Sequence, residues 1–70
     1  MKYKGYIGSV ERSEEDGTFF GRVTGISALI SYEGVTEKVL EADFQTAIDD
    51  YLMLCIEQGI EPERAKANLL

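Results

Sequence analysis

The sequence predicts an α+β domain in which a three-stranded antiparallel sheet packs against one long α-helix. Residues 3–32 hold three short segments rich in Tyr, Phe, Ile and Val, and turn residues separate them, which is typical of strands joined by hairpins. Residues 37–58 contain neither Gly nor Pro, so a helix can run through them unbroken. With 70 residues, the chain makes one domain at most.

The first strand is expected at residues 3–11, where Tyr, Ile and Val are frequent and no helical stripe of apolar residues can be drawn. Gly5 and Gly8 weaken a strand interior, so they indicate a bulge or a close approach by another backbone. Residues 13–17 (SEEDG) have turn chemistry, because Asp tolerates turn conformations and Gly accepts a positive φ. A second strand follows at residues 18–23, and the two strands form a hairpin.

A third strand is expected at residues 28–32. Thr24 and Gly25 supply the turn before it, and Glu33 and Gly34 end it. Because sequential strands with short connections usually pair side by side, the three strands are expected to form one antiparallel sheet.

The helix expected at residues 37–58 would be roughly 33 Å long. Thr36 is a good N-cap, since its hydroxyl can accept hydrogen bonds from the free N–H groups of the first turn, and Gly59 supplies the C-terminal stop. One broad apolar stripe of the helix can cover a face of the sheet. The members of this stripe are Leu40, Phe44, Ala47, Ile48, Tyr51, Leu52, Leu54 and Cys55.

Two groups of residues are candidates for binding a partner. The first group consists of apolar helix residues outside the stripe, which one sheet cannot cover and which therefore indicate a dimer or partner surface: Val39, Met53 and Ile56. The second group is the acidic hairpin loop, with the carboxylates of Glu14, Glu15 and Asp16.

The charge of the chain favours a basic protein as partner over a nucleic acid. Its 13 acidic and 7 basic residues give a net charge of −6. Nucleic-acid affinity comes largely from Lys and Arg that neutralise phosphates, so the charge argues against direct DNA binding. Complementary charge would speed association with a basic protein. Solubility is the simpler explanation of the same charge.

Small size and residue content suggest the oligomeric state and the location. Small domains without disulfides or metals often gain stability by oligomerising, so a homodimer or higher homo-oligomer is expected. The single cysteine, Cys55, cannot form an intramolecular disulfide, and the absence of His excludes the usual zinc sites. No apolar run approaches the roughly 18 residues of a membrane helix, and no leader-like segment opens the chain. We therefore expect a cytoplasmic protein without a membrane partner.

No catalytic, cofactor or metal site is expected, and the chain is not predicted to be an enzyme. Cys55 lies on the core stripe, where a thiol is inert. Neighbouring helix residues point about 100° apart, so Asp49 and Asp50 do not converge on one ion. A hard cation at the hairpin-loop carboxylates, as a metal-dependent nuclease would need, is less favoured than a solvated acidic turn.

Residues 61–70 are expected to form a short tail beside a main domain of residues 1–60. Pro62 suits the first turn of a short helix, and the residues around it are good helix formers, so a short C-terminal helix or strand is possible. The alternative is a mobile end, since chain termini fray unless they are anchored.

The order of several short motifs resembles the HicB-like antitoxin family. The resemblance covers about residues 1–60, and the ordered combination carries it, since no single motif is diagnostic. In chain order the matching segments are residues 3–8 (YKGYIG), 13–17 (SEEDG), 19–21 (FFG), 25–26 (GI), 30–34 (ISYEG), 43–44 (DF) and 49–52 (DDYL).

The resemblance implies a partial RNase H-like β-β-β-α fold that lacks the nuclease carboxylates. Members of this family neutralise a small, basic, RNA-cleaving HicA toxin by covering its surface, and many form dimers or tetramers. They commonly continue into a DNA-binding segment, whereas residues 61–70 here carry two basic residues, Arg64 and Lys66. The resemblance therefore implies an antitoxin-like binding module for a HicA-like toxin. The alternative is an orphan dimeric regulatory or nucleic-acid-associated protein without its own catalysis.

Overall fold

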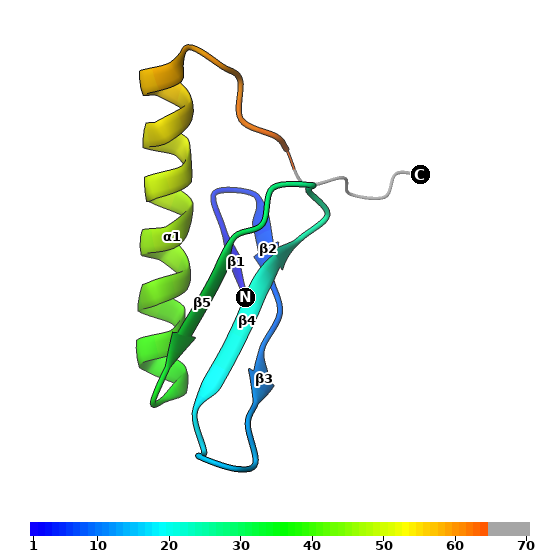
Figure 1. Cartoon of the computed structure of the whole chain (residues 1–70), viewed down its shortest axis with the longest axis vertical. Helices are drawn as coiled ribbons and strands as arrows, with labels where there is room; N and C mark the ends of the chain where they lie inside the picture. Colours follow the sequence, from blue (N-terminus) through cyan, green and yellow to red (C-terminus); the bar gives the residue numbers. More distant parts are fainter. Residues whose placement is uncertain (65–70) are drawn as a thin grey trace.

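The computed structural model describes residues 1–64, which form two layers, an antiparallel sheet and one helix (Figure 1). Buried and exposed residues alternate along the two longest strands, and the buried ones mark the face on which the helix packs. The predicted α+β class is confirmed, but the sheet has five strands and not three. In chain order the elements are β1 (Lys2–Tyr3), β2 (Tyr6–Gly8), β3 (Glu11–Arg12), β4 (Phe19–Thr24), β5 (Ser31–Gly34) and α1 (Glu37–Gln58).

The expected strand at residues 3–11 is wrong as a single element, because this segment is divided among β1, β2 and β3. Lys4 and Gly5 both have a positive φ, of 52° and 85°. A two-residue turn of this kind matches the twist of an antiparallel pair, and it folds β1 directly back onto β2. Gly5 is thus a hairpin residue and not part of a strand interior.

The break between β2 and β3 leaves the register intact and keeps one main-chain bond, from the N–H of Ser9 to the carbonyl of Arg22 at 3.0 Å. Both strands pair with β4 in one continuous alignment on either side of residues 9–10. At the break, the N–H of Arg22 donates to the side-chain oxygen of Ser9 at 3.0 Å. The hydroxyl of Tyr32 donates to the main-chain carbonyl of Ser9 at 2.9 Å. A side chain from β5 has therefore replaced part of the ladder.

The third strand lies later in the chain than the predicted residues 28–32, because β5 spans Ser31–Gly34. Glu33 and Gly34 pair with β4 and do not end the strand. Gly34 also permits the start of the helix to approach, since a Cβ at this position would lie 2.5 Å from the backbone nitrogen of Leu40.

The helix agrees with the prediction at both ends. Thr36 is the N-cap, and its hydroxyl accepts a hydrogen bond from the N–H of Val39 at 3.1 Å. Gly59 ends the helix in the left-handed conformation, with a φ of 70°. The N–H of Ile60 then donates to the carbonyl of Cys55, and that of Gly59 donates to the carbonyl of Ile56. This pair of bonds satisfies two carbonyls of the last turn.

The core lies between α1 and the sheet. Cys55 is buried on the helix, as its place on the stripe predicts, and Leu54 is the exception, with 49% of its surface exposed. Leu54 stands about 100° around the helix from Cys55, which puts it at the border of the stripe. The buried apolar residues are Tyr6, Val23, Ile30, Tyr32, Leu40, Phe44, Ile48 and Cys55.

Tyr32 fills the centre of this core because two glycines leave room for its ring. Its ring meets that of Phe44 edge to face, with centroids 5.1 Å apart. A Cβ on Gly8 would lie 2.1 Å from the Tyr32 hydroxyl, and a Cβ on Gly21 would lie 2.0 Å from the carbonyl oxygen of Ser9. The expected close approach at Gly8 is therefore real, but it is made by side chains and not by another backbone.

The outer edge of β5 is partly closed by a side chain. Among the described residues β5 pairs only with β4, which leaves its other edge unpaired. The outward N–H of Glu33 donates to the Asp43 carboxylate at 3.0 Å. A helix side chain thereby accepts a hydrogen bond from one of the main-chain N–H groups at this edge.

The described part of the tail, residues 61–64, forms neither helix nor strand. It leaves the end of α1 and runs back toward the loop between β4 and β5 (Figure 1). The remainder of the predicted tail, residues 65–70, lies outside the described residues.

The packing at Gly21 predicts that the substitution Gly21→Ala destabilises the domain by about 1–3 kcal/mol, because the new methyl group must displace a strand backbone. Urea unfolding followed by circular dichroism measures this change in the free energy of unfolding. Ser31→Ala, at an exposed position of β5, is the matched control and should change stability by less than about 0.5 kcal/mol. Equal effects of the two substitutions would contradict the packing argument.

Candidate binding surfaces

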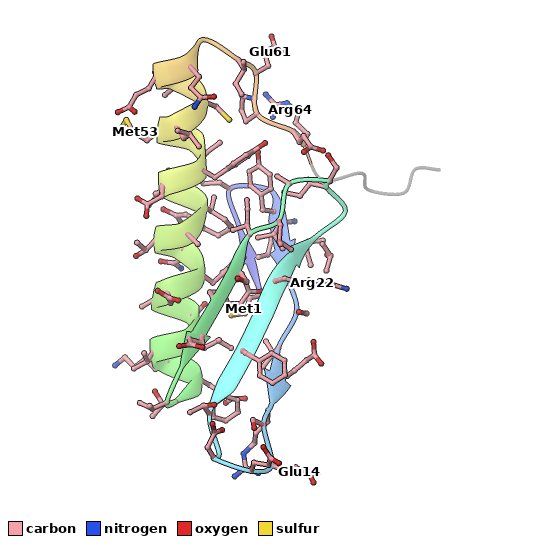
Figure 2. The ribbon with its side chains drawn as sticks, in the orientation of Figure 1. Met1, Glu14, Arg22, Met53, Glu61 and Arg64 are labelled. Carbon is pink, nitrogen blue, oxygen red and sulfur yellow. The ribbon has the colours of Figure 1, made fainter. Side chains whose placement is uncertain are left out.

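The partner-binding residues predicted from the sequence lie at two opposite ends of the molecule. Glu14 belongs to the loop between β3 and β4, whereas Met53 lies near the C-terminal end of α1 (Figure 2). Val39 is in the first turns of α1, about 21 Å along the helix axis from Met53. The predicted residues therefore do not form one surface.

At the hairpin end, Asp16 and Val39 line the same open hollow of about 310 Å³. Val35, which is 69% exposed, lies in the wall of this hollow, as does Glu33. We refer to this region as the acidic end, and its members are Glu14, Glu15, Asp16, Glu33, Val35 and Val39. The hollow combines carboxylates with uncovered valine side chains.

The three carboxylates of the hairpin loop have different roles. Asp16 accepts hydrogen bonds from the hydroxyl and the N–H of Thr18, at 2.8 Å and 3.2 Å. These bonds lower the pKa of Asp16, the hydroxyl bond most strongly, and they hold the turn in shape. Glu14 and Glu15 are exposed. Asp16 thus shapes the loop, and its two neighbours extend their charge into the solvent.

Sequence reasoning did not identify Glu33 and Val35 as members of the acidic end. Glu33 was expected to end the third strand, and its outward direction follows only once β5 is known to include it. Val35, which directly precedes the N-cap Thr36, was not assigned to a surface. Glu33 and Val35 alternate along the chain with the buried residues Tyr32 and Gly34. This period of two was the signal from which their exposure to solvent could have been predicted.

The face of the sheet that α1 does not cover is a second exposed surface. Ile7, Phe20 and Leu29 stand on it, and the last two are 40% and 84% exposed. Phe20, Leu29 and Arg22 line a shallow hollow of about 380 Å³. We call this side of the sheet the open face. The sequence analysis placed Phe20 in a strand but did not predict the face of the sheet on which it stands.

Met53 and Ile56 form the third exposed group, on the side of α1 that points away from the sheet. Both side chains are more than half exposed. Their exposure is as predicted, but they lie far from the carboxylates of the hairpin loop. They therefore do not share a surface with the carboxylates of the acidic end.

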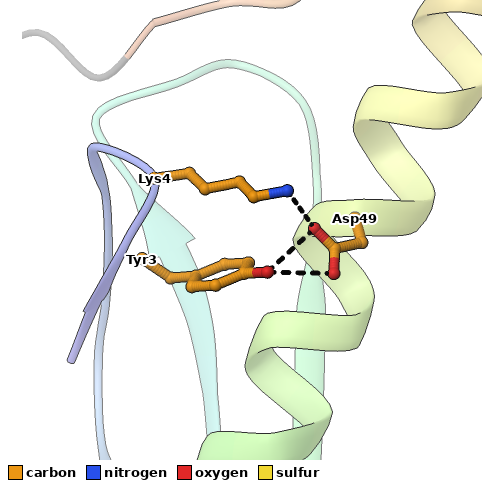
Figure 3. Close-up of polar contacts among 3 residues, drawn as sticks. All are labelled: Tyr3, Lys4 and Asp49. Atoms are coloured by element: carbon orange, nitrogen blue, oxygen red, sulfur yellow. Dashed lines mark hydrogen bonds and ion pairs between the residues drawn. The ribbon is translucent and has the colours of Figure 1, made fainter.

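A polar cluster joins the first hairpin to the helix (Figure 3). The Tyr3 hydroxyl donates to the Asp49 carboxylate at 3.1 Å, and the Lys4 ammonium lies 2.8 Å from the same group. The hydrogen bond from Lys4 is the largest influence that lowers the pKa of Asp49, and the same bond raises the pKa of Lys4. Asp50 lines a different hollow beside Leu29. The two aspartates do not converge, so this cluster is a tie between elements.

The segment after the helix makes a second tie, which the sequence analysis did not anticipate. We call residues 60–64 the strap. The carboxylate of Glu63 accepts three hydrogen bonds from Ser27 and Ala28 in the loop between β4 and β5. The main chain of Glu63 is bonded to the hydroxyls of Tyr6 and Tyr51.

Within residues 1–64 no group of three or more His, Cys, Asp or Glu side chains is placed to hold a metal ion. In the same part of the chain no helix is long and apolar enough to cross a membrane. The three exposed regions are thus the surfaces from which a function can be argued.

Comparison with known proteins adds no relative: no family model, no curated protein and no solved structure matches this chain.

The cluster around Asp49 predicts a specific pH dependence of stability. Because the folded-state pKa of Asp49 lies below the ordinary value of 3.8, the stabilisation is present above that value and is lost as the pH falls through the folded pKa. Asp49→Asn should therefore lower stability near neutral pH, and the gap to the unaltered chain should narrow at about pH 3. Urea midpoints at the two pH values measure it.

The control for this experiment is Asp50→Asn, which changes the adjacent exposed carboxylate. It should leave the urea midpoint nearly unchanged at both pH values. A gap for Asp49→Asn that is the same at both pH values would show that the carboxylate charge is not the stabilising feature.

Proposed function

We propose that this chain is an antitoxin-like binding module of the HicB-like kind, which neutralises a small basic RNA-cleaving protein by covering its surface. The observation that carries the proposal is the acidic end, where carboxylates surround a hollow with exposed valines. The observed α+β class, an antiparallel sheet packed against one helix, supports the proposal, although the sheet has five strands. The partial RNase H-like relationship and the cytoplasmic location are parts of this proposal.

The charges of the acidic end would favour the approach of a basic protein. Glu14 and Glu15 project from a loop whose shape the Asp16–Thr18 bonds maintain. Exposed charges of one sign steer an oppositely charged protein toward the surface and increase the association rate. A ribonuclease that binds RNA needs a basic surface, so the acidic end competes for the groups that would hold phosphate.

The valines of the acidic end would supply apolar contact in the bound complex. Val35 and Val39 are exposed in a chain that buries few large side chains, and they border the carboxylates directly. An apolar contact ringed by charge is the usual anatomy of a specific protein interface, in which a desolvated centre supplies affinity and the rim supplies selectivity. The partner is therefore expected to bring an apolar side chain surrounded by Lys and Arg.

Reversing the loop charges is the direct test of this proposal. The double substitution Glu14→Lys and Glu15→Lys should lower the association rate with a small basic ribonuclease encoded beside this gene by about tenfold at low salt. The difference should shrink at high salt, because screening removes long-range steering. Stopped-flow binding and an RNA-cleavage assay measure the rate and the inhibition.

The matched control carries the same change in net charge away from the acidic end, as Asp50→Lys with Glu57→Lys, two exposed helix positions. It should retain most of the association rate. If both pairs slow association equally, only net charge matters and the acidic end is not the binding site. Absence of any small basic ribonuclease beside the gene would count against the toxin as partner.

The second candidate is an orphan dimeric regulatory or nucleic-acid-associated protein, and the open face favours it. Ile7, Phe20 and Leu29 expose apolar area on a flat sheet, and a second copy of the chain would cover it. Arg22 on the same face is a cation in an acidic chain, which a carboxylate of the second copy would meet.

This candidate predicts a dimer in sedimentation experiments at about 100 µM, because marginal small domains gain buried area on pairing. Leu29→Ser should shift the average mass toward the monomer, whereas Ile56→Ser, at a helix position that is also largely exposed, should leave it unchanged. A monomer at all concentrations would exclude pairing through the open face. A shift of an RNA or DNA oligonucleotide at low salt would favour the nucleic-acid role over the antitoxin.

A further inference from the structure

The strap is held by hydrogen bonds to both the side chain and the main chain of Glu63. One oxygen of the Glu63 carboxylate accepts from the N–H of Ser27 at 2.8 Å. The other oxygen accepts from the Ser27 hydroxyl at 2.8 Å and from the N–H of Ala28 at 2.9 Å. Two adjacent main-chain donors and one hydroxyl thus converge on one carboxylate, which is the geometry of an anion-binding loop.

The main chain of the same residue is recognised as well. The N–H of Glu63 donates to the Tyr51 hydroxyl at 2.8 Å, and its carbonyl oxygen accepts from the Tyr6 hydroxyl. The two tyrosine rings pack edge to face with centroids 6.3 Å apart, and Tyr6 is buried. Burial raises the pKa of Tyr6, so its hydroxyl remains a donor at neutral pH. The ring of Tyr6 is therefore held in the core, and that of half-buried Tyr51 packs against it.

These contacts recognise both a side chain and the main chain of a peptide. The loop residues Ser27 and Ala28 select a carboxylate side chain, and the two tyrosines select an extended main chain. Recognition of main-chain polar groups together with one charged side chain is how peptide sites combine affinity with selectivity. The strap, residues 60–64, forms neither helix nor strand, and its main-chain groups at Glu63 bond instead to the two tyrosine hydroxyls.

We propose that Tyr6, Tyr51 and the loop at Ser27 and Ala28 form a binding site for an extended peptide with a carboxylate side chain, filled by the chain's own strap in the isolated protein and by the strap of a second copy on exchange. The second copy carries the same residues, so every hydrogen bond made within one chain is reproduced between two. Such exchange of an identical segment is a low-cost route to a dimer.

The short connection between α1 and the strap favours binding of the chain's own strap over a peptide from outside. The strap leaves the helix at Gly59, whose φ of 70° sets the direction of exit. A ligand on so short a tether has an effective concentration in the millimolar range, so the chain's own strap prevails at micromolar protein concentration. Loss of the Glu63 carboxylate weakens this competitor, because three of the hydrogen bonds that hold the strap are lost, and a ligand from outside can then displace it.

The test uses the full chain with Glu63→Ala and a synthetic capped peptide with the sequence of residues 59–64 (GIEPER). The peptide should bind the Glu63→Ala chain at least about tenfold more tightly than it binds the unaltered chain, where the strap competes. The same peptide with Glu63→Ala should not bind. Amide chemical shifts of Ser27 and Ala28 should move on binding, which locates the peptide at the loop.

Two controls keep the result interpretable. Circular dichroism checks that the Glu63→Ala chain is folded, and Glu63→Gln repeats the experiment with a neutral side chain of nearly the same shape. Equal binding of the two peptides, or shifts confined to residues away from Ser27 and Ala28, would overturn the proposal. Failure of the peptide to bind the Glu63→Ala and Glu63→Gln chains at millimolar concentration would overturn the proposal as well. These results are independent of binding at the acidic end.

Discussion

The side chain of Tyr32 holds the two layers of this domain together. Its ring packs against Phe44 of the helix, and its hydroxyl lies within hydrogen-bond distance of the carbonyls of Ser9, between β2 and β3, and of Arg22 in β4. This arrangement requires glycine at positions 8 and 21, because a Cβ at either would collide with the tyrosine or with the strand it bonds. Burial raises the pKa of Tyr32, the hydrogen bond to Ser9 opposes this effect, and the group remains a donor in the physiological range.

Two polar ties add to the apolar contacts that join the margins of the domain to this centre. A chain of this size buries only about 60% of the surface that its unfolded form exposes, so the core alone leaves a thin margin of stability. The Lys4–Asp49 pair joins the first hairpin to the helix, and Glu63 joins the strap to the loop between β4 and β5. Both ties connect residues more than 30 positions apart in the sequence. They compensate for a helix that covers only one side of the sheet.

The parts of the fold that could be predicted from the sequence are those set by local chemistry. The helix limits follow from Thr36 and Gly59, whose capping preferences act within one turn. The strand division at Lys4 and Gly5 was not predictable in the same way, because Lys rarely adopts a positive φ and nothing in its neighbours requires it. The limits of β5 depended on how closely Leu40 approaches Gly34, which is a tertiary contact.

The candidate sites show the same division. The exposure of Met53 and Ile56 follows from helical period alone, and so does the burial of Cys55. The joining of Asp16 and Val39 in one hollow required the β3–β4 loop to lie beside the start of α1, which no short pattern encodes. The site of Glu63 was hidden for a related reason, since its donors are ordinary main-chain groups that have no signature in the sequence.

The hydrogen bond from the Glu33 N–H to Asp43 has a consequence for the behaviour of the protein at high concentration. An exposed strand edge is a template on which other chains can add, and repeated addition produces insoluble fibrils. At β5 an incoming strand would have to break this hydrogen bond, and its own carbonyl oxygens would lie beside the negative charge of Asp43, which is unfavourable. A single aspartate on the helix thus acts as a gatekeeper, and it lets a small protein keep a strand at the rim of its sheet while resisting amyloid growth from that rim.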